Sequence, residues 1–169
     1  MSEPTWVGID EVVALNHAIV TETGEDHGIV HVTKLEAAIH RPIQYHAYGP
    51  EDRRDDLVLL GVKLCVGVSE SQGFIQGNKR TGLAAMEMFF NINGYAIAPT
   101  AQGDLADLIL ASAHPDKSIR LSDDDFADRL DIHVVERCSE ILDGGFLAGR
   151  GVGKLSQTLR EDRGPADRS

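Results

Sequence analysis

The stretch Gln72 to Thr81, which reads QGFIQGNKRT, lies between two segments of helical periodicity and decides how the fold is read. Upstream, apolar residues recur on one side of a helix expected from Asp55 to about Ser69. Downstream, a second helix is expected from Asn78 to about Asn91, and Asn93-Gly94 is a good stop because both residues tolerate left-handed geometry. The stretch is therefore interpreted as a glycine-containing turn that leads into a helix N-terminus.

The helix N-terminus expected at Asn78 has the chemistry of an anion-binding site. Free backbone N–H groups and the positive end of the helix dipole attract anions there. Lys79 and Arg80 fall in the first turn, where cations are unfavourable unless an anion compensates them. Such a conflict with a local rule is typical of a functional position. The alternative interpretation is a capped helix start with two solvated cations.

The remaining sequence predicts an all-α fold with one short extended element. Further helices are expected from Asp10 to about Thr23, from a Thr33–Glu36 capping box to Arg41, from about Asp104 to Ala113, and from Ser122 to Gly144-Gly145. Because the residue before a proline is pushed out of the helical region, Pro42 to Pro50 is expected to form an extended, hairpin-like flap. One domain is expected over residues 1–145, and residues 146–169 are expected to form a flexible tail.

Composition argues against several classes of protein. The net charge is −11, and a protein-wide electrostatic grip on nucleic acid would need a basic face. No segment approaches the ~20 apolar residues of a membrane span, and no signal-peptide pattern is apparent. We therefore expect a cytoplasmic protein that binds neither nucleic acid nor membrane. Cys65 and Cys138 are too few for a disulfide framework and are expected to be small buried side chains.

The decisive stretch resembles the signature of the Fic/Doc family, and it is closest to death-on-curing (Doc) toxins. That signature reads His-x-Phe-x-(Asp/Glu)-(Gly/Ala)-Asn-(Gly/Lys)-Arg, and death-on-curing members typically continue as Asn-Lys-Arg-Thr. The residues in register here are Phe74, Gly77, Asn78, Lys79, Arg80 and Thr81. The similarity spans about residues 6 to 117 and includes Trp6 to Leu15, Gly28-Ile29, Leu35 to Pro42, Ala47-Tyr48-Gly49 and Asn93-Gly94-Tyr95.

The resemblance implies a Fic/Doc helical bundle and a transferase that uses ATP and Mg²⁺. In the family the loop binds nucleotide phosphates, the motif histidine deprotonates a target hydroxyl and the motif acid holds Mg²⁺. Fic enzymes transfer AMP to protein hydroxyls, whereas Doc toxins phosphorylate a translation elongation factor and are usually inhibited by a separate small antitoxin. Carried over by position, the implied phosphate cradle is Gly77, Asn78, Lys79, Arg80 and Thr81. Arg80 would also serve catalysis, Phe74 would anchor the loop, and Arg41 to Gly49 would be the flap that aligns the target.

Two positions depart from the family signature, and both concern the same chemical step. Gln72 stands at the histidine position, and a neutral amide cannot act as a general base, which typically costs ~10²–10⁴ in rate. Gln76 stands at the acid position, where an amide oxygen brings no charge, although Mg²⁺ sites lean on carboxylates and phosphates. The pair predicts weak or absent transfer and weakened Mg²⁺ binding.

Other residues offer partial replacements for the missing groups. His46, in the expected flap, is a candidate substitute base if it faces the phosphate loop. His27 and His31 are four residues apart, but no second cluster completes a metal site. The family's self-inhibitory motif, Ser/Thr-x-x-x-Glu-Gly/Asn, is matched in its first part by Thr21 to Glu25, where Asp26 follows.

Three functions stay open at this point. The first is a death-on-curing-like toxin that transfers phosphate or AMP from ATP to a protein hydroxyl with impaired activity. The second is an inactive Fic-fold pseudoenzyme that binds a nucleotide or an antitoxin-like protein. The third is a decayed toxin. The retained residues Asn78, Lys79 and Arg80 favour binding of a phosphate ligand under either of the first two.

Overall fold

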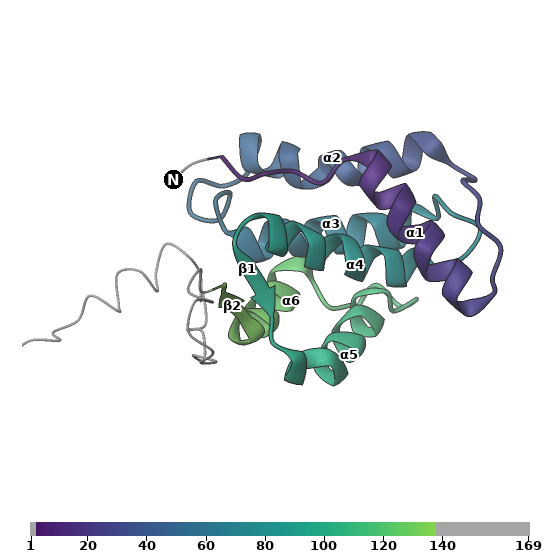
Figure 1. Cartoon of the computed structure of the whole chain (residues 1–169). Helices are drawn as coiled ribbons and strands as arrows, with labels where there is room; N and C mark the ends of the chain where they lie inside the picture. Colours follow the sequence, from purple (N-terminus) through teal and green to yellow (C-terminus); the bar gives the residue numbers. More distant parts are fainter. Residues whose placement is uncertain (1–2, 138–169) are drawn as a thin grey trace, which may run out of the picture.

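The computed structural model describes residues 3–137, and helices make up most of that part of the chain (Figure 1). In chain order the elements are α1 (Ile9–Thr23), α2 (Val32–Tyr48), α3 (Leu57–Ser71), α4 (Asn78–Ile92), β1 (Tyr95–Ile97), α5 (Gln102–Ser112), α6 (Asp123–Leu130) and β2 (Val134–Glu136). Short 3₁₀ turns, Pro99–Ala101 and Asp131–His133, precede α5 and follow α6. The expected all-α fold with a short hairpin element is confirmed. The expected tail, residues 146–169, and Cys138 lie outside the described residues.

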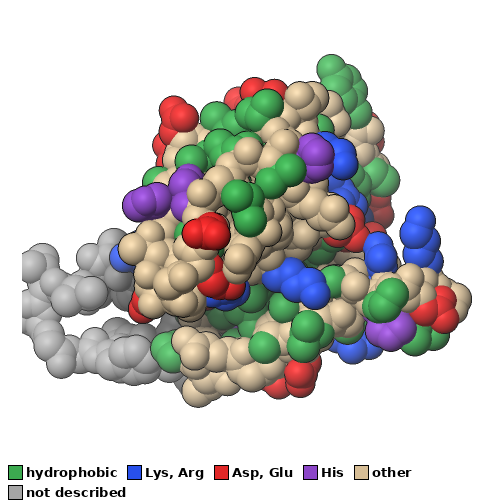
Figure 2. All heavy atoms as spheres, turned by 90° about the vertical axis from the view of Figure 1, so that its right-hand side faces the viewer, with side chains coloured by type: hydrophobic (Ala, Val, Ile, Leu, Met, Phe, Trp, Pro, Cys, Tyr) green, Lys and Arg blue, Asp and Glu red, His purple; other side chains and the backbone are tan. Residues whose placement is uncertain are grey.

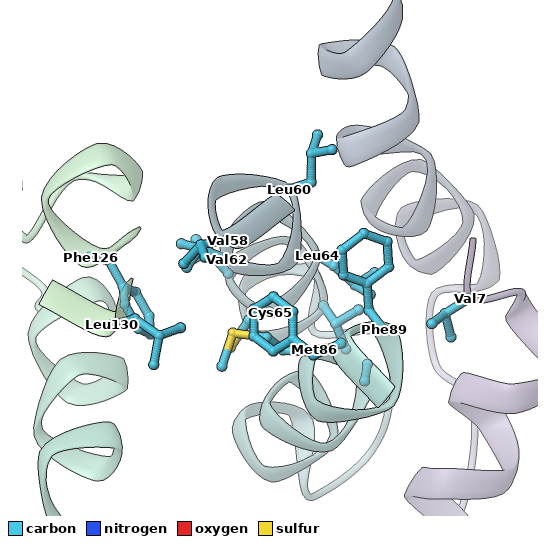
Figure 3. Close-up of a cluster of buried hydrophobic side chains, with 14 of the residues drawn as sticks. Val7, Val58, Leu60, Val62, Leu64, Cys65, Met86, Phe89, Phe126 and Leu130 are labelled. Carbon is cyan, nitrogen blue, oxygen red and sulfur yellow. The ribbon is translucent and has the colours of Figure 1, made fainter. Parts of the chain in front are cut away.

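Helix α3 lies at the centre of the fold. Every residue from Leu57 to Val68 is buried, so this helix has no solvent face. A helix that is hydrophobic all round must be enclosed by other elements. Figure 3 shows Phe126 and Leu130 of α6 on one side of α3, with Met86 and Phe89 of α4 on the other. Cys65 lies in this core as a free thiol, and burial raises its pKa, so it is a small apolar side chain as expected.

The expectation of an extended flap over Pro42 to Pro50 is wrong, because α2 continues through Pro42 to Tyr48. Proline in a helix interior costs about 3 kcal/mol, since it removes one backbone donor. Here α2 buries Leu35, Ala38, Ile39 and Pro42 itself, and this packing offsets the cost. Gly67 of α3 lies against the carbonyl of Ala38, the helical acceptor that Pro42 leaves without a donor; a Cβ at Gly67 would be 3.0 Å from that oxygen. The two-stranded sheet lies instead after the motif helix, where β1 pairs antiparallel with β2.

Two helix ends also differ from expectation. The capping box at Thr33 does not form, because α2 begins at Val32 with His31 as its N-cap and no side-chain cap. The amides of Val30 and His31 donate instead to Gly73 O at 2.6 and 3.2 Å, which fixes the helix start by a tertiary contact. The second is the end of α6. Ser122 caps the start of this helix as expected, but the helix ends at Leu130 because the chain then enters β2 beside β1.

Helices α3 and α4 approach each other closely, and glycine makes the approach possible. A Cβ at Gly82 would lie 2.5 Å from the backbone oxygen of Cys65 and 2.3 Å from Ser69 Oγ. A Cβ at Gly61 would lie 2.6 Å from the Phe90 ring. The crossing therefore sets the position of the N-terminal half of α4 relative to the end of α3. No helix among residues 3–137 has both the length and the apolar character that a membrane crossing needs.

We expect Gly82→Ala to lower the free energy of unfolding by about 1–3 kcal/mol, because the added methyl collides with the Cys65 carbonyl and overpacks the crossing. The matched control is Gly103→Ala at an exposed position of α5, where a Cβ meets nothing within 4 Å and the helix should gain up to about 1 kcal/mol. Chemical denaturation of both variants measures the difference. Equal stabilities would contradict the close crossing.

Candidate functional site

The loop between α3 and α4 turns through two left-handed residues. Gln72 ends α3 with φ 49°, and Gly77 begins α4 with φ 78°. Gln72 is the only non-glycine residue with positive φ among residues 3–137, and its side chain is exposed. A Cβ at Gly77 would lie 3.0 Å from Val20 Cγ1 and 3.2 Å from Asn16 Nδ2. Glycine at this position therefore permits both the left-handed backbone conformation and the close approach of α1.

Asn78 closes the loop on itself. Its Oδ1 accepts from the Phe74 amide at 3.0 Å, and its Nδ2 donates to the Phe74 carbonyl at 2.9 Å. Phe74 is 2% exposed and belongs to the hydrophobic core. The side chain of Asn78 thus holds the loop through both its oxygen and its nitrogen.

A second segment, residues 28–31, supports the loop from outside. Ile75 N donates to Gly28 O at 2.9 Å, and Ile29 forms an antiparallel bridge with Phe74. With the bonds from Val30 and His31 to Gly73 O, this segment pairs with residues 73–75 like a short strand. The chain between α1 and α2 is therefore tied to the motif loop by its backbone.

Asn16 of α1 connects the loop to α4 from within. Its side chain is fully buried, and its Nδ2 donates to Gln76 O at 2.9 Å and to Thr81 Oγ1 at 3.0 Å. Because the Gln76 carbonyl only accepts, the amide nitrogen must face it and Asn16 Oδ1 must face His27, 2.9 Å away. His27 Nδ1 is then the donor to Asn16 Oδ1. Thr81 is fully buried as well, so its hydroxyl serves this network.

Arg80 is paired with a carboxylate from the end of α1. Its Nη2 contacts Glu25 Oε2, and its Nη1 donates to Thr23 Oγ1 at 3.2 Å. Thr23 Oγ1 also donates to Glu25 Oε2. These hydrogen bonds, first from Thr23 and then from Arg80, lower the pKa of Glu25 below its ordinary value, so it is ionised at neutral pH. The anion that the first turn of α4 requires is therefore supplied by the chain itself.

The N-terminus of α4 keeps further capacity for negative charge. Its N-cap residue Gly77 makes no side-chain cap, and its first turn contains no acid. Lys79 is exposed and makes no ion pair within residues 3–137. By contrast, Ser122 caps α6 and three aspartates fill its first turn. Helix α6 thus satisfies its N-terminus with side chains of its own first turn, whereas α4 has neither a side-chain cap nor an acid there and takes its carboxylate, Glu25, from the segment after α1.

The two glutamines lie at opposite ends of the loop turn. Gln76 is half-buried and its backbone carbonyl is held by Asn16, while Gln72 is exposed at the end of α3. Mg²⁺ prefers carboxylate oxygens, and no cluster of three His, Cys, Asp or Glu side chains suited to a metal occurs among residues 3–137. Glu25, the carboxylate that contacts this helix start, is engaged with Arg80. The donor set thus does not fit a protein-held Mg²⁺, but it fits a phosphate group.

The structure does not bring the proposed substitute base to the loop. His46 contacts Asp55 at 3.3 Å and the Arg54 carbonyl at 3.1 Å, and its ring lies beside Trp6. Leu35, near the start of the same helix, is the residue that would touch a Cβ at Gly73. At about 1.5 Å rise per residue, His46 lies roughly 16 Å farther along α2. His27 bonds to Asn16 beside the loop, and its ring packs edge-on against His17 at 5.0 Å and not against His31.

Sequence reasoning missed Asn16 and gave little weight to Glu25. The signal for Asn16 was present, because Val12, Asn16 and Val20 recur every four residues and form the buried stripe of α1. A polar residue in such a stripe needs a buried partner. For Glu25 the signal was the partial match Thr21 to Glu25, which the structure places against Arg80.

Figure 2 shows the end of the molecule at which α1 ends and the motif loop lies. Basic, acidic and histidine side chains are interleaved over this face, with hydrophobic side chains between them. Ile29, Val30 and Ile75, which flank the loop, are each about half exposed, at 44%, 52% and 54%. Lys and Arg side chains lie at several places on this face, and its charge is mixed.

In comparisons with known proteins, no family model and no curated protein matches this chain.

Proposed function

We propose that this chain is a death-on-curing-like member of the Fic/Doc family whose α3–α4 loop binds the phosphates of ATP, with impaired transfer to a protein hydroxyl. The observation that carries the proposal is the N-terminus of α4, which has no side-chain cap, has Lys79 and Arg80 in its first turn, and already holds a carboxylate on Arg80. An anion site of this kind needs positive charge, free donors and a fixed backbone. All three occur within the motif residues that match the family in register.

The loop is rigid enough to recognise a ligand without large rearrangement. The Asn78 clasp, the Asn16 bonds and the pairing with residues 28–31 fix its backbone from three sides. Phosphate oxygens would accept from the first-turn amides and from Lys79 and Arg80. Arg80 would have to exchange Glu25 for the ligand, since both are anions that use the same guanidinium. Binding is therefore expected to compete with this internal ion pair.

The motif loop of this chain supplies neither a general base nor an acidic metal ligand for the transfer step. Gln72 cannot accept the proton of an attacking hydroxyl, and His46 is too distant to replace it. Mg²⁺ bound to ATP would neutralise phosphate charge, but Gln76 adds no negative charge to hold the ion. We accordingly propose binding of ATP with slow or negligible turnover. In such a system a small antitoxin and a translation elongation factor are the partners that the family resemblance suggests.

A second candidate is an inactive Fic-fold pseudoenzyme that binds an antitoxin-like protein. The observation that favours it is the set of apolar side chains beside the loop, Ile29, Val30, Val32 and Ile75, each between 44% and 54% exposed. Exposed apolar side chains that gather beside polar ones are typical of protein-binding sites. In this candidate the loop still binds an anion, but the protein catalyses no transfer.

The first experiment is calorimetric titration of ATP, with and without Mg²⁺, into the native chain and Arg80→Ala. We expect micromolar binding by the native chain and a loss of about tenfold or more in the variant, because a charge-assisted hydrogen bond contributes about 1.5–3 kcal/mol. Arg129→Ala, which removes an exposed arginine of α6, is the matched control and should bind like the native chain. Absence of binding by the native chain under both conditions would overturn the nucleotide proposal.

Gln72→His with Gln76→Asp separates the two candidates. If only these positions limit transfer, the double variant should arrest growth of a bacterial host, because the general base restores ~10²–10⁴ in rate and the acid restores the metal ligand. Adding Arg80→Ala should remove the toxicity and serves as the control. A toxic native chain would contradict the pseudoenzyme candidate, and a harmless double variant that still binds ATP would contradict the impaired-toxin candidate.

A further inference from the structure

His27, which follows α1, is tied to the motif loop by the buried amide of Asn16. Its Nδ1 lies 2.9 Å from Asn16 Oδ1. On its other side, Asn16 Nδ2 donates to Gln76 O at 2.9 Å and to Thr81 Oγ1 at 3.0 Å. Since one carboxamide joins these bonds, His27 Nδ1 lies within about 8 Å of the Gln76 carbonyl oxygen. A histidine from outside the motif is therefore held beside the loop that the motif forms.

The same amide lies next to the guanidinium of α4 that carries the phosphate proposal. A Cβ at Gly77 would lie 3.2 Å from Asn16 Nδ2 and 3.8 Å from Arg80 Nη2, so both groups lie beside the cap of α4. Glu25, the carboxylate that contacts Arg80, is two residues before His27 in the chain. Two connections, one through a side chain and one through the backbone, thus hold His27 near the start of α4.

The bond to Asn16 determines which nitrogen of His27 donates. Asn16 Oδ1 only accepts, so the donor is His27 Nδ1. A neutral imidazole that donates from Nδ1 carries its lone pair on Nε2, and this nitrogen can accept a proton. In catalytic triads a third group orients the base through a bond of this kind, and an asparagine can be that group. The Asn16–His27 pair is therefore arranged as a base and its orienting partner.

Two further rings restrict the orientation of the His27 side chain. The ring of His17 in α1 packs edge-on against it at 5.0 Å, and the ring of Phe74 lies at 6.4 Å. Phe74 is buried in the core, so this contact also ties the imidazole to the motif loop. His27 is nevertheless exposed, and a substrate can reach it.

We propose that His27 is the general base of the slow transfer proposed above, in the role that Gln72 cannot fill; the inference rests on that proposed function. The acceptor hydroxyl lies between His27 Nε2 and the phosphate at Arg80. Its oxygen forms a bond to phosphorus while its proton passes to Nε2. The bond from that phosphorus to the next phosphate of ATP breaks, and its electron pair leaves with ADP in phosphate transfer or with pyrophosphate in AMP transfer.

Turnover with water as the acceptor tests this role without knowledge of the protein target. The full chain is incubated with ATP labelled at the α- or the γ-phosphate, and the release of labelled AMP or phosphate is measured. We expect slow hydrolysis by the native chain and a loss of at least about tenfold in His27→Gln, since a general base typically contributes ~10²–10⁴ in rate. His40→Gln, which removes an exposed histidine of α2, is the matched control and should hydrolyse ATP like the native chain.

The pH profile separates a base from a residue that only supports the loop. The native rate should fall as the pH is lowered, because a protonated imidazole cannot accept a proton, and this fall should be absent from the residual rate of His27→Gln. Other groups around His27 that carry or can gain a charge are its neighbour Asp26, His17 of α1 and the Arg80–Glu25 pair. His17→Gln should keep the native profile, and loss of the profile in that variant would contradict the role of His27.

Calorimetric titration of ATP into the same variants distinguishes failure of this inference from failure of the proposed function. His27→Gln should bind ATP within about twofold of the native dissociation constant, because the base is not a phosphate ligand. If the native chain does not bind ATP, the proposed function fails and this inference fails with it. If the native chain binds ATP without hydrolysing it, or if His27→Gln hydrolyses it as fast as the native chain, only this inference is overturned.

Discussion

The enclosure of α3 is the constraint on which the rest of the structure depends. A helix whose residues from Leu57 to Val68 are all buried cannot form a surface, so α2, α4 and α6 must cover it. The covering helices adapt to it at specific points. Helix α2 keeps its apolar side chains buried although Pro42 lies in its interior. Gly82 lets the backbone of α4 lie against that of Cys65. Only the C-terminal end of α3 reaches the surface, so only that end can contribute to a binding or catalytic site.

The loop after α3 is the candidate site because α4 starts without a side-chain cap and without an acid in its first turn. Within residues 3–137, α3 and α6 begin with a side-chain cap, from Asp56 and from Ser122, and three aspartates follow in the first turn of α6. Helix α4 instead begins with a bare glycine cap and two cations, and it relies on Glu25 from another helix for a counter-charge. Glu25 can stay on Arg80, or it can leave Arg80 and make room for an external anion. Under the proposed function, the affinity for a phosphate ligand would depend on how strongly Arg80 holds Glu25.

Much of the fold could be predicted from the sequence, because long apolar periodicities and Asn93-Gly94 mark the helices clearly. The errors have tertiary causes. Pro42 was interpreted from its local effect alone, whereas α2 continues through it with Pro42 buried and with Ala38 packed against Gly67 of α3. The α2 start was assigned to a side-chain cap, whereas Gly73, distant in sequence, receives the amides of Val30 and His31. For the site, the loop and its cations were evident from spacing, but the Asn16 network and the Glu25 pair depend on how α1 packs against α4.

The central claim is that Glu25 occupies the position on Arg80 that a phosphate would take, and Glu25→Gln tests it most directly. This variant keeps the size and hydrogen-bonding oxygen of the side chain and removes its charge, so the internal competitor is weakened while the loop is unchanged. Comparison of ATP dissociation constants for the native chain and Glu25→Gln is the measurement. The account predicts severalfold to about tenfold tighter binding by the variant, because a charged pair is replaced by a weaker neutral hydrogen bond. Equal or weaker binding by Glu25→Gln would contradict it.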